Sequence, residues 1–392
     1  MTPGRPRRAE EGQFAGGNTG VDCLYLWRML KRLHIQNFTV FADADFAFGP
    51  GLNVIVGTNG TGKSHVLKLG YVASRVTARI LGEEFLDTVS NWEVYLSQRL
   101  KDVFQPEELG KLVRWTAKKA PARISAEFKD TSFEQLIFSF SASAKQPVIN
   151  GKQPVDLHHH PQKTTIHRAI FIPPKEVLTL LWLRSIYKIR ILPIDDTYPS
   201  LLDLLSEIPL REPSKAANKA IRLLGEILEG EIEVEGDKSY IVSAERRLEI
   251  NLVAEGIRKF AMLERLLRNG VLTPNNPLFW DEPEANLNPA LLQKLAKVLA
   301  ELARQNFQII LATHSLSLLK QFHILSREPD KQPLPIRYFG LNAAPNQPTT
   351  LVTVDDFELL PDVVALEVEL AQADALEEIF AQEDQRPDAN NN

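Results

Sequence analysis

The chain has 392 residues, of which 44% are hydrophobic and 24% are charged, and its formal net charge is −5. This length suits one large α/β domain or two coupled domains. The longest largely apolar run, around 177–183, is far shorter than the roughly 20 residues that cross a bilayer, so no membrane span is expected. A single cysteine, Cys23, excludes an intrachain disulfide and a four-cysteine zinc site, and we expect a cytoplasmic protein in a reducing compartment.

The charge is unevenly distributed along the chain. Residues 352–392 carry twelve acidic side chains and one basic side chain, Arg386, so the remaining 44 basic and 38 acidic residues give the body a net charge of +6. Such a small basic excess is compatible with nucleic-acid contact, but it is far from the strongly basic domain that would predict it. An ordinary solvated surface is the simpler interpretation.

The predicted fold begins near Met29. The leader before it, 1–28, contains Gly, Pro and Arg without a sustained pattern, so we expect it to be disordered or to be the product of an upstream start codon. Residues 33–56 follow the pattern strand, turn, strand, and they end in the run LNVIV, which is typical of a buried parallel strand. The helical spacing of apolar residues from Lys63 to Ile80 predicts a helix directly afterwards.

Residues 83–240 carry mixed signals and are predicted to form an inserted or lateral α+β region. No heptad pattern persists there for three or four repeats, which argues against a long coiled-coil arm. The expected elements are a helical stretch at 89–112, a hairpin at 124–140, a short strand at 170–172 and helices between 177 and 228.

From Tyr240 onward the periodicity sharpens again. We expect a helix at 256–269, a strand and loop in LFWDEPEANLNP, an amphipathic helix at 290–304 and a strand and turn in QIILATHS. Strands and helices that alternate in this way predict a parallel sheet with covering helices. After the leader, we therefore divide the chain into four parts. These are a first core part with the phosphate loop (29–82), the lateral region (83–240), a second core part (241–345) and an acidic C-terminal segment with a disordered end (346–392).

Residues 57–64, GTNGTGKS, match the phosphate-loop pattern G-x-x-x-x-G-K-[ST] between a predicted buried strand and a predicted helix. The glycines let the backbone wrap around phosphates, and the amides at the helix start point their dipoles at them. Lys63 is expected to reach the terminal phosphates and the Ser64 hydroxyl to bind Mg²⁺. A glycine-rich turn without a ligand is the alternative. The predicted nucleotide-binding residues are Gly57, Thr58, Asn59, Gly60, Thr61, Gly62, Lys63, Ser64 and His65.

Two further strand ends carry candidate catalytic side chains. In PLFWDEPE an aspartate ends a short apolar strand and a glutamate follows it. We expect Asp281 to hold Mg²⁺ through water and Glu282 to accept a proton from an attacking water. His314 follows the apolar strand IILAT, and because strand ends in an open parallel sheet line one crevice, we expect it beside the terminal phosphate. Taken alone, the acidic pair is more typical of a solvated loop and the histidine of a structural hydrogen bonder.

The motifs GTNGTGKS, WDEPEANLNP and ATHS, in this order after an N-terminal HIQNFTVF strand pair, resemble the ABC-type ATPase heads of the SMC, RecF and OLD group, often grouped as AAA-family ATPases of the 15/21 type. The resemblance covers residues 30–80 and 240–345. It implies a P-loop NTPase fold with an ABC-ATPase-like mixed and mainly parallel sheet, ATP as ligand, Mg²⁺ as cofactor and ATP hydrolysis. It assigns Glu282 as general base and His314 as switch histidine.

The same resemblance points to a signature segment that caps the nucleotide of a partner subunit. The match is LVAEGIRKFAMLERLL, with Gly256 at the helix start and Ala254 in place of the usual serine, and a plain core helix is the alternative. Asn288 occupies the position of the usual D-loop acid or histidine, so slow hydrolysis is expected. Phe38 and Phe41 lie where such heads often place an aromatic ring against adenine, although a core role is equally compatible.

The resemblance also implies an ATP-dependent homodimer that sandwiches two ATP molecules and reopens after hydrolysis. It favours a DNA-associated ATPase in repair, genome maintenance or anti-phage defence. A separate effector such as a nuclease is expected, because the acidic tail lacks the acid pattern of a nuclease domain. An ABC transporter's nucleotide-binding subunit is one alternative, although no intact SGGQ signature or clear lid glutamine is evident. A nucleotide-gated scaffold that rarely turns ATP over is another.

Overall fold

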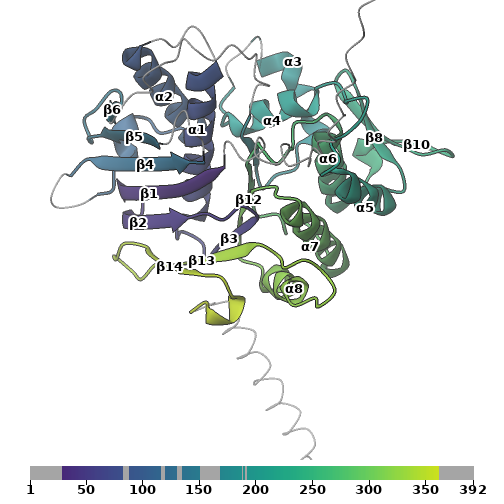
Figure 1. Cartoon of the computed structure of the whole chain (residues 1–392). Helices are drawn as coiled ribbons and strands as arrows, with labels where there is room; N and C mark the ends of the chain where they lie inside the picture. The colour runs from purple at the N-terminus through teal and green to yellow at the C-terminus, as the bar shows by residue number, and fades with distance from the viewer. Residues whose placement is uncertain are drawn as a thin grey trace, which may run out of the picture.

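The computed structural model describes residues 29–361 except 83–87, 116–119, 130–134, 151–167, 188, 190 and 191 (Figure 1). The expected leader, 1–28, and the end of the acidic C-terminal segment, 362–392, lie outside the described residues. Among the helices that are described, none is both long enough and apolar enough to cross a bilayer.

A six-stranded sheet forms the centre of the molecule, in the order β14-β13-β3-β12-β11-β7. Its neighbours pair in parallel, except that β14 runs antiparallel to β13. Leu52 and Val54 of β3 pack into one apolar core and Ile55 into the other, and burial on both faces requires the continuous apolar run. The strands are β3 (Leu52–Gly57), β7 (Ile170–Ile172), β11 (Leu278–Asp281), β12 (Ile309–Thr313), β13 (Ile336–Asn342) and β14 (Thr350–Val354).

A second, antiparallel sheet has the order β2-β1-β4-β5-β6. Helix α1 (Lys63–Gly82) lies between the two sheets, because its buried side chains share one core with the inner faces of both, including Ile55 and Phe279 of the central sheet. The strands of the second sheet are β1 (Leu30–Phe38), β2 (Phe41–Ala47), β4 (Ala122–Phe128), β5 (Gln135–Phe140) and β6 (Val148–Asn150).

The opposite face of the central sheet is covered by helices whose apolar stripes enter the larger core. There Trp280 of β11 is fully buried, and the amphipathic pattern expected at 290–304 forms α7. The helices of this layer are α6 (Glu255–Arg268), α7 (Pro289–Arg304) and α8 (Leu316–Ser326). The chain thus has the α/β architecture of a P-loop NTPase, with a mixed sheet between layers of helices.

Residues 83–240 contribute to both sheets, because β4 pairs with β1 and β7 pairs with β11. The rest forms α2 beside α1 and a cluster of helices with a three-stranded sheet on the right of Figure 1. The division of the chain into domains stays a prediction. The elements of this region, besides the strands already given, are α2 (Val89–Phe104), α3 (Leu183–Tyr187), α4 (Thr197–Leu205), α5 (Asn218–Leu228), β8 (Glu231–Glu235) and β9 (Lys238–Val242), with 3-10 turns at Leu109–Leu112 and Leu178–Leu180. Strand β10 (Arg247–Glu249), which pairs with β9, and the 3-10 turns at Ile250–Leu252 and Phe357–Leu359 come later in the chain.

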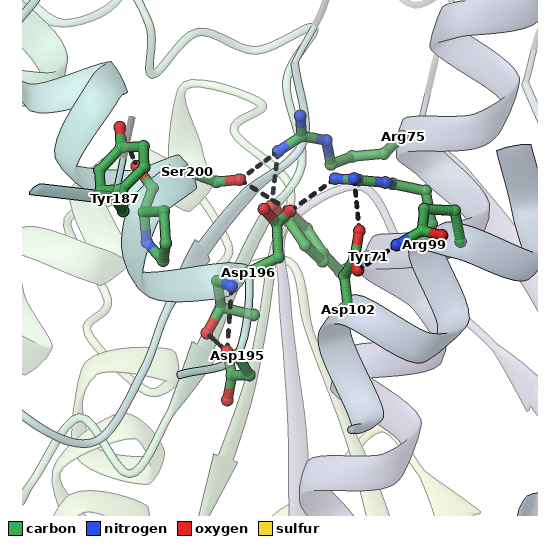
Figure 2. A network of polar contacts seen from close by, with 11 residues as sticks. Tyr71, Arg75, Arg99, Asp102, Tyr187, Asp195, Asp196 and Ser200 are labelled. Carbon is green, nitrogen blue, oxygen red and sulfur yellow. Dashed lines mark hydrogen bonds and ion pairs between the residues drawn. The ribbon is translucent and has the colours of Figure 1, made fainter. Parts of the chain in front are cut away.

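A polar network joins α1 and α2 to the start of α4 (Figure 2). Arg99 of α2 donates to Asp196 (2.7 Å) and to Asp102 (2.5 Å). Arg75 of α1 donates to the Ser200 hydroxyl (2.8 Å), which in turn donates to Asp196 (3.0 Å). Because the Asp196 and Arg99 side chains are only 22% and 19% exposed, this network ties the lateral helices to the helix that follows the phosphate loop.

We predict that Asp196→Ala lowers the free energy of unfolding by about 2–4 kcal/mol, because it removes the carboxylate that accepts from both Arg99 and the Ser200 hydroxyl in a mostly buried network. Asp45→Ala is the control. Asp45 pairs with Arg32 on the surface, where the side chains are 43% and 46% exposed, and its loss should cost less than about 1 kcal/mol. Urea unfolding of both variants measures the difference, and equal losses would contradict the structural role of the network.

Candidate functional site

The phosphate loop connects β3 to α1, and its shape depends on glycine. Gly60 and Gly62 have φ angles of 84° and 93°, which other residues rarely adopt. A Cβ atom on Gly62 would lie 2.6 Å from Val40 Cγ2 and 2.8 Å from Phe41 Cε2. The β1–β2 turn therefore supports the loop from outside, while the Thr61 hydroxyl donates to the Thr58 carbonyl (2.8 Å) within it.

Lys63 begins α1 and extends back across the loop. Its Nζ atom donates to the carbonyls of Gly57 (2.8 Å) and Thr58 (3.0 Å). Burial lowers the pKa of Lys63, and the negative charges of Glu282 and Asp281 oppose this shift. The predicted phosphate-binding lysine thus lies within the field of the predicted carboxylates.

Asp281 ends β11 and is 5% exposed. Burial raises its pKa, and hydrogen bonding to Ser64 opposes the increase. Its Oδ1 atom is buried without a hydrogen-bond partner among the described residues. A buried, unpaired carboxylate oxygen beside a hydroxyl is a hard oxygen donor set, which fits Mg²⁺ held by a few protein ligands, phosphate oxygens and water.

Glu282 has a φ angle of 49°, an unusual conformation for a residue other than glycine. Its N–H donates to the Ala312 carbonyl (3.0 Å), so pairing with the β12 chain continues one residue beyond β11. The His314 Nδ1 atom lies 3.6 Å from Glu282 Oε1, and the two side chains are 53% and 33% exposed. The two predicted catalytic side chains therefore meet in a solvent-accessible position at the edge of the sheet.

Glu284 is a central residue that the sequence analysis missed. Its Oε1 atom accepts hydrogen bonds from the Thr313 hydroxyl (2.7 Å) and the His314 N–H (3.0 Å), and it lies 3.4 Å from His314 Nδ1. The second glutamate of DEPE is the signal that could have found it. Through these hydrogen bonds, Glu284 connects the loop after β11 to the turn after β12 and so fixes the position of His314 relative to Glu282.

Lys259 of α6 approaches the same loop and was also missed. Its residue is 3% exposed, and its Nζ atom donates to the Pro283 carbonyl (3.1 Å). Burial lowers the pKa of Lys259 to about 8, against the attraction of Glu284 and neighbouring carboxylates. An apolar helical stripe surrounds this residue in the sequence, so only the fold shows that it is buried beside the catalytic loop.

Gly256 is not placed beside the phosphate loop of its own chain. It lies in the first turn of α6, where the atoms nearest to a Cβ would be Leu287 Cδ2, Leu291 Cδ1 and the Asn286 carbonyl, 3.1–3.2 Å away. Its contact with a partner's nucleotide stays a prediction. Asn288, expected at the D-loop position, accepts a hydrogen bond from the Leu291 N–H (2.9 Å) and is the N-cap of α7.

The aromatic residues proposed to contact adenine are core residues instead. Phe38 and Phe41 are 0% exposed, and Phe38 packs edge-to-face against Phe104 and Phe140. They alternate with the polar positions of their strands and thus point into the core between the sheets. His65, expected near the nucleotide, is half-buried, with its Nδ1 atom 3.0 Å from the Thr39 hydroxyl, and burial lowers its pKa.

Comparisons with known proteins identify the family and the fold. A family model described as "AAA domain, putative AbiEii toxin, Type IV TA system" matches residues 52–320, and a second AAA-domain model matches residues 32–68. A search of curated proteins found no match.

Among solved structures, the chain is similar to an SMC head bound to the C-winged helix domain of ScpA, with 12% identity, a TM-score of 0.50 and coverage of 84% of this chain and 98% of that chain. At this identity the likeness shows a shared fold. The SMC head domain from Thermotoga maritima has 16% identity, a TM-score of 0.45 and coverage of 83% and 98%. The Smc head with an extended coiled coil, bound to the C-terminal domain of ScpA derived from Pyrococcus furiosus, has 12% identity, a TM-score of 0.46 and coverage of 90% and 99%.

We predict that Gly62→Ala destabilises the protein more than Gly60→Ala. Both substitutions place a side chain at positive φ, which costs about 1 kcal/mol. At Gly60 nothing lies within 4 Å of the new Cβ, whereas at Gly62 the new atom overlaps Val40 and Phe41, which adds about 1–3 kcal/mol. Urea unfolding measures both variants, and equal losses would contradict the support of the loop by the β1–β2 turn.

We further predict a pH-dependent effect of Lys259→Met. The usual lysine pKa is 10.5 and the native value is about 8, so between these values the unfolded chain binds more protons and native stability rises with pH. The stability of the native protein relative to the methionine variant should therefore increase by about 3 kcal/mol from pH 8 to 10.5. Unfolding of both proteins at several pH values measures this; a constant difference would show that the buried amine is not forced toward neutrality.

Proposed function

The chain belongs to the AAA-domain family whose model spans residues 52–320, and it is an AAA-family P-loop protein with an SMC-head-like fold. We propose that it hydrolyses ATP in the presence of Mg²⁺ and works as an ATP-dependent dimer. One observation carries this proposal: β12 pairs with both β11 and β3, so Asp281 and Glu282 at the end of β11 lie at the same sheet edge as the loop that ends in Lys63, although they are more than 200 positions away in the chain. ATP hydrolysis requires a lysine on the phosphates, a carboxylate for the metal ion and a base for the attacking water at one site.

In the proposed reaction, the amides of the loop and the Lys63 ammonium bind the β- and γ-phosphates. The Ser64 hydroxyl and Asp281 would hold Mg²⁺, and the bound ion would supply positive charge against the phosphate oxygens. Glu282 accepts the proton of the attacking water. His314 lies close enough to Glu282 to orient that water or to contact the γ-phosphate, and Glu284 holds the turn that carries His314.

We infer the dimer from the position of Gly256, because one chain alone does not bring this residue to its own phosphate loop. Gly256 packs against the loop before α7 rather than against the phosphate loop of its own chain, so its proposed role as a signature residue requires a second copy. Two copies would then enclose two ATP molecules, and loss of the γ-phosphate would reopen the pair. The absence of a side-chain cap at the α6 start leaves its first amides available for that contact.

The process that uses the switch is proposed more broadly. We favour DNA repair, genome maintenance or anti-phage defence with a separate effector such as a nuclease, on the strength of the SMC-like fold and the mildly basic body. A slow scaffold that retains ATP is a second candidate, because Asn288 is used as a helix cap and therefore offers little to a neighbouring site. Phosphate release with and without duplex DNA distinguishes them: stimulation favours the first, and retention without turnover favours the second.

We predict that Glu282→Gln reduces the rate of ATP hydrolysis by about 100-fold or more, because the amide cannot accept the proton of the attacking water. ATP binding should persist, and light scattering with saturating Mg·ATP should show a dimer. Lys63→Ala should abolish both ATP binding and the dimer, since it removes the ammonium that holds the terminal phosphates.

Glu233→Gln is the matched control, because Glu233 is a 51% exposed side chain on β8, and it should leave both properties unchanged. A Glu282→Gln protein that binds ATP and stays monomeric would show that the sandwich is wrong. Unchanged hydrolysis in that variant would show that Glu282 is not the general base.

A further inference from the structure

A pocket of about 480 Å³ adjoins the phosphate loop at Gly60. Its other walls come from three segments that are far apart in the sequence. These are the β1–β2 turn, the segment after the 3-10 turn at Leu109–Leu112 and the β13–β14 hairpin. The residues they contribute are Thr39, Val40, Arg114, Trp115, Ala343, Asn346, Gln347 and Thr349.

Backbone hydrogen bonds hold these walls together. The Thr39 N–H donates to the Leu112 carbonyl and the Arg114 N–H to the Asn37 carbonyl, both at 2.8 Å. On the other side, the Thr349 N–H donates to the Val40 carbonyl at 3.1 Å. The β1–β2 turn is thus bonded to both other segments, and the pocket is formed in advance rather than assembled around a ligand.

Trp115 is the unexplained feature of this pocket. Its side chain is 94% exposed, the highest value among the large hydrophobic residues that the structure describes as exposed. Leaving so large an aromatic surface in water is unfavourable, whereas a nucleobase stacks on it readily. The side-chain amides of Asn346 and Gln347 line the same pocket, and such amides hydrogen bond to the edges of purines.

We propose that this pocket binds the purine base of the nucleoside triphosphate and that Trp115 stacks on the base. This inference rests on the proposed function, since it assumes that residues 57–64 hold the phosphates. The base of such a ligand is one ribose away from its phosphates and must lie beside the phosphate loop. Gly60 belongs both to the phosphate loop and to the pocket wall, and no atom lies within 4 Å of the position that its Cβ would take. Phe38 and Phe41 are fully buried and leave this role open.

The test compares two ligands that differ in the nucleoside. Calorimetry measures the affinity of the wild-type chain and of Trp115→Ala for Mg·ATP and for Mg·tripolyphosphate, which has the phosphates but no base. We expect Trp115→Ala to weaken ATP binding by roughly 5- to 100-fold and to leave tripolyphosphate binding unchanged. Trp115→Phe should restore most of the ATP affinity because phenylalanine keeps an aromatic face.

Trp182→Ala is the matched control, because Trp182 is 49% exposed and does not line the pocket. It should leave both affinities unchanged. Equal ATP affinities of the wild type and Trp115→Ala would overturn the proposal, as would an equal loss of affinity for both ligands. If the wild-type chain binds neither ligand, the proposed function itself fails, and this result is distinct from a failure of the base pocket alone.

Discussion

The burial of opposite charges at one edge of the central sheet is the constraint on which the site depends. Lys63 and Asp281 are 6% and 5% exposed, and burial drives the pKa of each group toward its neutral form. Loop carbonyls hold the ammonium, but one carboxylate oxygen of Asp281 has no partner among the described residues. Such an arrangement costs free energy in the free protein, and a ligand that carries both phosphate oxygens and a metal ion would compensate for it.

The same edge is connected mechanically to the lateral helices through α6. At one end of this helix Lys259 contacts the loop that contains Glu282 and Glu284. Toward its other end Arg265 donates to the Leu205 carbonyl (2.9 Å), and Glu264 accepts from the Ile232 N–H (3.4 Å). Helix α6 therefore bonds to the catalytic loop on one side and to α4 and β8 on the other.

The sequence predicted the parts of the site that lie in contiguous motifs. The strand before the phosphate loop, the helix after it and the shared position of Asp281, Glu282 and His314 follow from strand ends that meet at one edge of a parallel sheet. Glu284 was missed because its partner Thr313 lies 29 residues away, and a hydrogen bond at that separation leaves no local pattern. Phe38, in contrast, was considered for the site but lies in the core. Its spacing from the phosphate loop cannot distinguish a ring that contacts a ligand from one that packs in the core.

The position of α1 between the two sheets brings the phosphate loop into contact with both of them. The helix lies between the central sheet, which carries the acidic strand end, and the antiparallel sheet, which carries the β1–β2 turn. The phosphate loop at its start contacts both, through Ser64 toward Asp281 and through Gly62 toward Phe41. A nucleotide on this loop would therefore have its phosphates beside the acidic strand end of the central sheet. Its base would lie in a pocket that the β1–β2 turn shares with the β13–β14 hairpin of the central sheet. The β1–β2 turn both supports the phosphate loop and lines the pocket. A substitution in this turn would therefore affect the binding of the phosphates and of the base together.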